Sequence, residues 1–151
     1  MENIFIKLEI NDFNIGDFNK RSTNNYKNSD IIMFVYSIDD NQSFEKILRK
    51  LSSLKLKNKQ LVVLVGNKSD MESRNVSQKE AEQAVIKYNL GFFMEVSAKT
   101  GSNIDSMFYE AVEKIYKGRK NVKSNSYKVV ELSKGEEDKK NKSALRFLIP
   151  A

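Results

Sequence analysis

The stretch Leu61-Val62-Val63-Leu64-Val65-Gly66-Asn67-Lys68-Ser69-Asp70 decides the fold of this chain. Its first five residues form a continuous apolar run rich in β-branched side chains, which is typical of a strand covered on both faces in a parallel sheet. The run ends at Gly66 and passes into a polar loop. Because ligands of open α/β sheets bind outside the carboxyl ends of the strands, we expect this loop to lie at a ligand site.

A second polar segment follows the next apolar run. Ser97-Ala98-Lys99 comes after the expected strand Phe92–Val96. Asn67, Lys68 and Asp70 match the Asn-Lys-x-Asp motif of guanine-nucleotide-binding proteins, and Ser97-Ala98-Lys99 matches a second motif of the same proteins. Two such motifs in this order, each placed after a strand, predict a site for a guanine base.

The chemistry of guanine explains these residue types. The base presents an N1–H and an exocyclic amine side by side, and the carboxylate of Asp70 can accept from both. Adenine lacks this pair of donors and would leave the carboxylate unpaired, which typically gives discrimination of roughly 10⁴ or more. The Ala98 N–H could donate to the guanine carbonyl oxygen, and the stems of Lys68 and Lys99 could lie along the two faces of the base. The structural alternative is a Gly-Asn turn after a buried strand, followed by an unrelated Ser-Ala-Lys.

Composition limits the chemistry that the chain can perform. Its 151 residues suffice for one compact domain and include no cysteine and no histidine, so a disulfide, a zinc site or a copper site is not expected. Any metal would be bound through oxygen atoms, as Mg²⁺ is. Residues 1–116 hold 16 basic and 16 acidic side chains, whereas residues 117–151 hold 10 and 4, so the net charge of +6 belongs to the tail.

The basic tail suggests few partners by itself. It could make a weak contact with anionic membranes, worth about 1 kcal/mol per charge near the surface. A nucleic-acid partner is not expected, because the basic residues lack interleaved aromatic side chains and any recognised binding module.

Hydrophobic periodicity predicts alternating strands and helices, and therefore a parallel α/β sheet. The helices are expected to begin after Asp39-Asp40-Asn41, at the capping box Ser77–Glu80 and at Asn103. Residues 118–143 are polar and without periodicity, which favours a flexible tail. The expected strands are Ile4–Ile10, Asp30–Ser37, Leu61–Val65 and Phe92–Val96, and the first two helices run to about Leu56 and Asn89.

In these motifs and their order, the chain resembles the Ras superfamily of small GTPases, and most closely its Rab branch, from about Ile4 to Lys117. The resemblance implies a three-layer fold like that of the P-loop NTPases, with a parallel sheet flanked by helices, truncated at its N-terminus. Residues 1–117 would be a partial GTPase domain and residues 118–151 a basic, flexible tail.

The resemblance also implies a function. It suggests a cytoplasmic protein, peripheral at endomembranes, that binds GTP or GDP and meets effector or regulator proteins in vesicle trafficking. Family members usually end in prenylated cysteines, and this sequence has none. The residues that would hold the base are Asn67, Lys68, Asp70, Ser97, Ala98 and Lys99.

Other family motifs are absent or altered. No stretch matches the phosphate-binding loop Gly-x-x-x-x-Gly-Lys-Ser/Thr, which supplies backbone N–H groups, a lysine and a hydroxyl for Mg²⁺. Asp12 aligns with the aspartate that lies just outside the direct ligands of Mg²⁺, and a plain strand-end role is the alternative. The water-orienting glutamine that should follow is missing, and Asp17 stands there if Gly16 is aligned with the motif's glycine.

The missing first strand of the family would lie between the first two strands of this chain. Its loss would leave buried backbone groups unpaired, at about 1–3 kcal/mol each, against a total stability of about 5–15 kcal/mol. Either these two strands pair directly, or another segment fills the slot, or the fold is marginal. The best candidate to fill the slot is Ala144–Ile149.

Three readings of the function follow. The first is a degenerate Rab-like GTPase that binds nucleotide weakly and hydrolyses GTP negligibly. The second is a non-catalytic interaction module whose partner binding does not depend on the nucleotide. The third is an incomplete gene model of an active GTPase, which an upstream phosphate-binding loop in frame would support.

Overall fold

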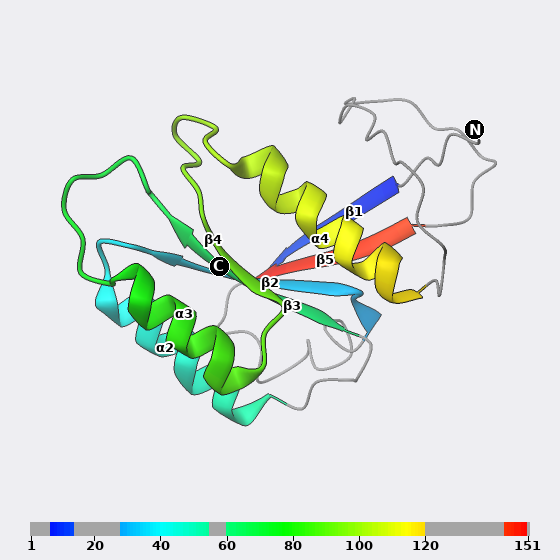
Figure 1. Ribbon diagram of the computed structural model, residues 1–151, viewed down its shortest axis with the longest axis horizontal. Helices are drawn as coiled ribbons and strands as arrows, with labels where there is room; N and C mark the ends of the chain where they lie inside the picture. Colours follow the sequence, from blue (N-terminus) through cyan, green and yellow to red (C-terminus); the bar gives the residue numbers. More distant parts are fainter. Residues whose placement is uncertain (1–6, 14–27, 55–59, 120–143, 151) are drawn as a thin grey trace.

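Figure 1 shows the computed structural model of the chain, which describes residues 7–13, 28–54, 60–119 and 144–150. In these residues five strands form one sheet in the order β1-β5-β2-β3-β4, and every pair is parallel. The expected parallel α/β sheet is therefore confirmed. The strands are β1 (Lys7–Phe13), β2 (Ile31–Ser37), β3 (Leu61–Asn67), β4 (Phe92–Glu95) and β5 (Ala144–Pro150); the helices are α2 (Asn41–Ser53), α3 (Gln78–Tyr88) and α4 (Ile104–Arg119).

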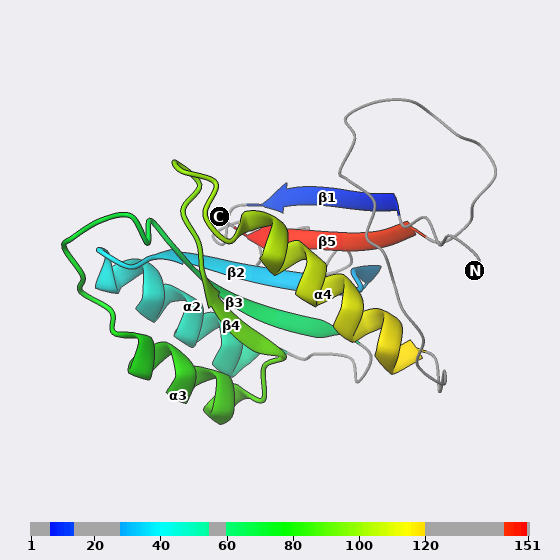
Figure 2. The same ribbon diagram turned by 45° about the horizontal axis from the view of Figure 1, so that its top comes forward.

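The last strand in the sequence lies inside the sheet. β5 runs between β1 and β2, as both Figure 1 and Figure 2 show. This confirms that residues 144–149 fill the slot between the first two strands, and β1 and β2 do not pair directly. β5 pairs with β1 from Lys7 opposite Ala144 to Phe13 opposite Pro150, and with β2 at Ile31 opposite Phe147 and Ile32 opposite Leu148.

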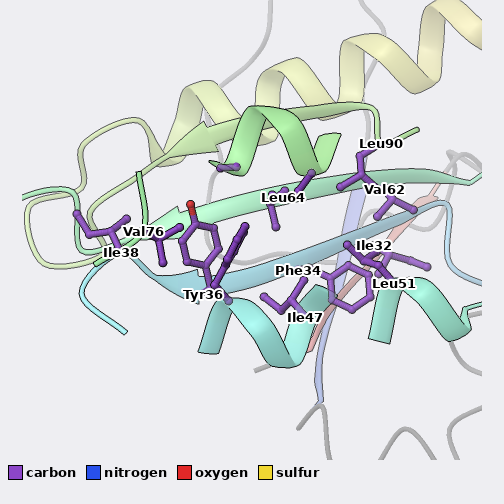
Figure 3. Close-up of a cluster of buried hydrophobic side chains, with 13 residues drawn as sticks. Ile32, Phe34, Tyr36, Ile38, Ile47, Leu51, Val62, Leu64, Val76 and Leu90 are labelled. Atoms are coloured by element: carbon purple, nitrogen blue, oxygen red, sulfur yellow. The ribbon is translucent and has the colours of Figure 1, made fainter. Parts of the chain in front are cut away.

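The sheet is covered on both faces, which gives three layers. On one face, alternate residues of β2 and β3 pack against α2 and α3 (Figure 3). On the other face, the intervening residues pack against α4. The first cluster includes Ile32, Phe34, Tyr36, Ile47, Leu64 and Ala84, and the second includes Ile31, Met33, Val63, Val65, Met107 and Ala111.

Capping side chains start the first two of these helices as expected. The carboxylate of Asp40 accepts from the N–H groups of Gln42 (2.9 Å) and Ser43 (3.2 Å) and so begins α2. Ser77 and Glu80 form a reciprocal capping box at the start of α3. Asn89 ends α3 in the left-handed conformation, with φ of 51°. These local signals satisfy backbone groups that a helix leaves unpaired at its ends.

The first strand differs from the expectation. β1 begins at Lys7 and includes residues 11–13, which were expected to be loop, while residues 1–6 lie outside the described part. Ile10, an apolar residue of the expected strand Ile4–Ile10, is 52% exposed. The reason is position: β1 is the edge strand, where Leu8 still packs against the cluster under α4 but the sheet receives less cover further along.

Smaller differences concern the ends of elements. α2 ends at Ser53 rather than Leu56, and α4 extends to Arg119, two residues past the expected domain boundary. The division of the chain at residue 117 stays a prediction for residues 120–143, which lie outside the described residues, as do 14–27 and 55–59. Among the helices of the described part, none is long and apolar enough to cross a membrane.

Candidate guanine-base site

The two polar loops meet at the carboxyl ends of β3 and β4. The Val96 N–H donates to the Gly66 carbonyl oxygen at 2.8 Å, and the Ser69 N–H donates to the Val96 carbonyl oxygen at 3.0 Å. The backbone of one loop is thereby tied to that of the other. Lys68, between them, adopts a left-handed conformation with φ of 67°, which turns the chain sharply at the end of the strand.

Asn67 joins the two motifs through its side chain. Its Oδ1 accepts from the N–H of Lys68 at 2.8 Å and from the N–H of Ala98 at 3.0 Å. These residues are about thirty positions apart in the sequence, so the contact exists only because β3 and β4 are neighbours. Asn67 therefore acts as a brace that fixes the relative position of both loops.

Asp70 is held by the second loop. The Ser97 hydroxyl donates to Oδ1 of Asp70 at 2.6 Å, and the ammonium of Lys99 lies 3.8 Å from Oδ2. The hydrogen bond from Ser97 is the main cause that holds the pKa of Asp70 below its usual range, and Lys99 and Lys68 act in the same direction. Asp70 is therefore a charged acceptor at neutral pH, as the pairing with guanine requires.

Ser97 holds the carboxylate of Asp70 in position. It is fully buried, and its Oγ also accepts from the N–H of Thr100 at 3.1 Å. Its carbonyl oxygen accepts from the N–H of Gly101 at 2.8 Å, and Gly101 has φ of +80°, a conformation that favours glycine. The loop is a tight turn whose geometry is set by its own backbone.

The backbone N–H of Ala98 already has an acceptor within the chain. The Ala98 N–H, expected to face the guanine carbonyl oxygen, donates instead to Asn67. A base that uses this N–H would have to share it with Asn67 or displace that bond. The other five predicted residues, Asn67, Lys68, Asp70, Ser97 and Lys99, are brought together at the ends of β3 and β4 by the contacts above.

The sequence did not point to a role for Asp39 at this site. Lys68 Nζ lies 3.2 Å from both carboxylate oxygens of Asp39, which comes from the loop after β2. The Ser37 hydroxyl donates a short hydrogen bond to Asp39, and this bond, followed by the one from Lys68, lowers the pKa of Asp39. Asp39 belongs to the run Asp39-Asp40-Asn41 that predicts a helix cap, but Asp40 alone caps α2.

An open cavity of about 490 Å³ lies next to Asn67 and Lys68, and its lining includes none of Asp70, Ser97, Ala98 and Lys99. Asn67 and Lys68 line one side, Ser37 lies at the end of β2, and Asp12 lies near the end of β1. Among the described residues, no group of three acidic or histidine side chains could hold a metal ion. The side chains of the described residues therefore do not form an Mg²⁺ site by themselves.

Comparison with known proteins agrees with this arrangement. A model of the Ras family matches residues 1–117. Ras-related protein Rab-2B of Dictyostelium discoideum is 39% identical over 99 residues, covering 61% of this chain and 46% of that protein. Ras-related protein Rab-18 of Lymnaea stagnalis is 33% identical over 93 residues, covering 60% of this chain and 46% of that protein.

A third relative differs in its organisation. Circularly permutated Ras protein 1 of Dictyostelium discoideum is 34% identical over 113 residues, which are 72% of this chain and 13% of that protein. The chain thus spans less than half the length of each of these curated relatives. Because the family model covers more than half of the residues, and the fold and both base motifs agree with it, this chain belongs to the Ras superfamily as a Rab-like small GTPase.

Proposed function

We propose that this chain binds guanine nucleotides, GDP or GTP, through the loops at the carboxyl ends of β3 and β4. The observation that carries the proposal is the position of Asp70, an ionised carboxylate held by Ser97 and Lys99 beside a loop that Asn67 braces. Its side chain is 19% exposed, so it is accessible to solvent rather than fully buried.

Each residue has a distinct part in this proposal. Asp70 accepts from the N1–H and the amine of the base, a charge-assisted pair that adenine cannot form. Lys68 and Lys99 have side chains that are 48% and 83% exposed, so their stems are free to lie along the faces of the base. Ser97 and Asn67 act through their neighbours: they position Asp70 and Ala98.

We infer that hydrolysis of GTP by this chain is negligible. The sequence has no Gly-x-x-x-x-Gly-Lys-Ser/Thr loop, and the glutamine that would orient water is replaced. The chain supplies residues that would bind the base but no phosphate-binding loop of this kind, so we expect nucleotide binding to be weak. An effector or regulator protein, and a role in vesicle traffic at endomembranes, would follow from the kinship with the two Rab proteins.

The test compares two neighbouring carboxylates by calorimetric titration with GDP. Asp70→Ala removes the acceptor of the base and should abolish measurable binding. Glu72→Ala changes an exposed carboxylate two residues away and should leave binding as it is in the unaltered chain. ADP should not bind to any of the three proteins, because it lacks the paired donors.

Two results would count against the proposal. If ADP binds as well as GDP, or if the Asp70→Ala and Glu72→Ala variants bind GDP equally, the pocket does not recognise guanine. Turnover of GTP above that of Asp70→Ala would refute the inference about hydrolysis alone.

A second candidate function is a non-catalytic interaction module that keeps the family surface. The ion pair between Lys68 and Asp39 favours it, because it gives the charge of the motif lysine a partner within the chain itself. Partner binding would then be equal with GDP, with GTP and without nucleotide.

The name of the third relative suggests an explanation for the order of the strands in this chain. That protein is described as circularly permutated, so a changed order of elements is an alternative to loss of the N-terminal region. We infer a changed order of elements in this chain, because β5 lies between β1 and β2 in the sheet although it follows them in the sequence.

A further inference from the structure

Arg74 and Glu95 join the two segments of the chain that carry the base loops. Arg74 lies after the first base loop, residues 67–70, and Glu95 lies before the second, residues 97–100. We propose that both are positioning residues of the guanine site, whose ion pair sets the direction in which Asp70 presents its carboxylate and thereby the preference for guanine. This inference rests on the proposed function and adds two residues that the base motifs do not contain.

The contact between these two side chains is short and made at two points. Arg74 Nη1 lies 2.6 Å from Oε1 of Glu95, and Arg74 Nη2 lies 2.9 Å from Oε2. The Glu95 side chain is largely buried, whereas that of Arg74 is partly exposed. A contact through both terminal nitrogens fixes the plane of the guanidinium, whereas a single hydrogen bond would let it rotate. The pair can therefore hold the backbone of residues 71–74 in one direction.

The segments on either side of the ion pair are tied together along their length. The ties are those of Ser69 to Val96 through the backbone, of Asp70 to Ser97 through side chains, and of Arg74 to Glu95. The first two lie at the base site and fix the place of Asp70. The third lies further along the chain, so it fixes the direction in which the segment leaves the site. A carboxylate that accepts two hydrogen bonds from one base edge needs both its place and its direction set.

Glu95 is itself held firmly by its surroundings. It lies opposite Gly66 in the pairing of β3 with β4, just before the first base loop. Its carbonyl oxygen accepts from the side chain of Asn103 at 2.9 Å, and Asn103 lies beyond the second base loop, at the start of α4. Arg74 is thus tied to a residue that contacts the chain around both loops.

The start of α3 does not depend on Arg74. Ser77 and Glu80 form the capping box there, and the side chain of Gln78 donates to Oε2 of Glu95 at 3.1 Å. The helix is therefore joined to β4 without the guanidinium. What the two hydrogen bonds of Arg74 add is the path of the segment between the first base loop and the helix.

The test compares two nucleotides that differ by one hydrogen-bond donor. GDP offers Asp70 both the N1–H and the exocyclic amine, whereas inosine diphosphate (IDP) keeps the N1–H and lacks the amine. The unaltered chain should bind GDP about tenfold more tightly than IDP, because one hydrogen bond to a charged acceptor distinguishes them. The ratio of the two dissociation constants therefore reports whether Asp70 accepts both bonds.

Two substitutions of Arg74 change the contact by different amounts. Arg74→Gln removes the charge and should lower the affinity for GDP about three- to tenfold and the GDP-to-IDP preference to about threefold or less, because a misdirected carboxylate loses the second bond. Arg74→Lys keeps the charge without the fork, so its preference should lie between those of Arg74→Gln and the unaltered chain. Calorimetric titration measures both nucleotides at a temperature where circular dichroism shows each protein to be folded.

The matched control is Ala84→Gly, which destabilises α3 in its interior, on the face that packs against the cluster with α2. Its thermal midpoint should fall, but its preference for GDP over IDP should equal that of the unaltered chain. If Arg74→Gln does not fold, the comparison is made between Arg74→Lys and this control.

The outcomes separate this inference from the proposed function. If the unaltered chain prefers GDP to ADP, but the Arg74 variants and Ala84→Gly give the same GDP-to-IDP ratio, the ion pair has a structural role only and this inference is overturned. If the unaltered chain does not prefer GDP to ADP, guanine recognition fails, and this inference fails with it. A ratio that falls in the Arg74 variants and not in Ala84→Gly is the expected result.

Discussion

At the scale of single residues, two adjacent carboxylates have separate roles. Asp40 caps α2, while Asp39 binds Lys68 with both oxygens at 3.2 Å. The cap is a local interaction, readable from the sequence. The ion pair joins residues 29 positions apart and depends on β2 and β3 being neighbours. This is why the motif residues were predictable and Asp39 was not.

We expect Asp39 to position the stem of Lys68 beside the base. Asp39→Asn should weaken GDP binding about two- to fivefold, the size expected for an exposed ion pair. Lys68→Met keeps the apolar stem but removes the charge, so adding Asp39→Asn to it should cause no further loss. Calorimetric titration of the two single variants and the double variant measures this coupling. Fully additive losses would show that Asp39 acts elsewhere.

Tyr36 is expected to affect the stability of the fold rather than the binding of nucleotide. Its hydroxyl is buried without a hydrogen-bond partner among the described residues, and burial raises the pKa of Tyr36 well above its usual value. Because a buried unpaired group is unfavourable, Tyr36→Phe should leave the free energy of unfolding unchanged or raise it by up to about 1 kcal/mol. Urea denaturation measures the change.

A substitution at Gly66, which lies next to the Tyr36 hydroxyl, gives a second test of this prediction. A Cβ at position 66 would lie 3.0 Å from the Tyr36 hydroxyl oxygen and 3.2 Å from Ile38 Cγ2. Gly66→Ala should therefore destabilise the chain by about 1–3 kcal/mol. Combining it with Tyr36→Phe should recover part of that loss. A large loss from Tyr36→Phe alone would mean that the hydroxyl has a partner after all.

At the scale of elements, the loop after β3 is tied to β4 by one ion pair. Arg74 binds Glu95 through two hydrogen bonds of 2.6 and 2.9 Å, and the Glu95 side chain is 10% exposed. Arg74 is the main cause that lowers the pKa of Glu95, with a contribution from Gln78. The pair thus fastens the segment between the two base loops and the start of α3.

This pair should make stability depend on pH. Because the pKa of Glu95 is lower in the folded chain, its contribution is complete above the unfolded value of about 4.3 and is lost as pH falls through the folded value. Glu95→Gln should cost about 1–2 kcal/mol at pH 7 and make the loss of stability below pH of about 4.5 shallower. Denaturation at several pH values measures both effects.

The control for this pair is Glu82→Gln, which changes an exposed position of α3 and should keep the acid dependence of the unaltered chain. If Glu95→Gln has the same acid profile as that control, the ion pair does not contribute to the pH dependence.

Element boundaries show how far local sequence signals extend. The capping box of α3 and the cap of α2 fixed where those helices begin, because the side chains involved are within three residues of each other. The strand β1 continues three residues past its expected end at Ile10, to Phe13. An edge strand has a face with little cover, so its hydrophobic pattern is a weaker guide, as the exposure of Ile10 shows.

At the scale of the whole molecule, the sequence predicted the parallel sheet and suggested residues 144–149 as the filler of its open slot. It could not supply the register or the direction of β5, because a six-residue apolar run contains no information about its partners. Those facts come from the pairing with β1 and β2. The same pairing changes the interpretation of the chain from a sheet with a strand missing to one in which an interior strand, β5, comes last in the sequence.

Amide hydrogen exchange tests this view in the intact chain. A strand with neighbours on both sides opens only with the sheet, so residues 145–149 should exchange within about tenfold of the slow rates of residues 32–36. β1 is the edge strand, so its outward-facing amides should exchange faster than those of β5. Random-coil exchange at residues 145–149 would mean that β1 and β2 are held together by something other than β5.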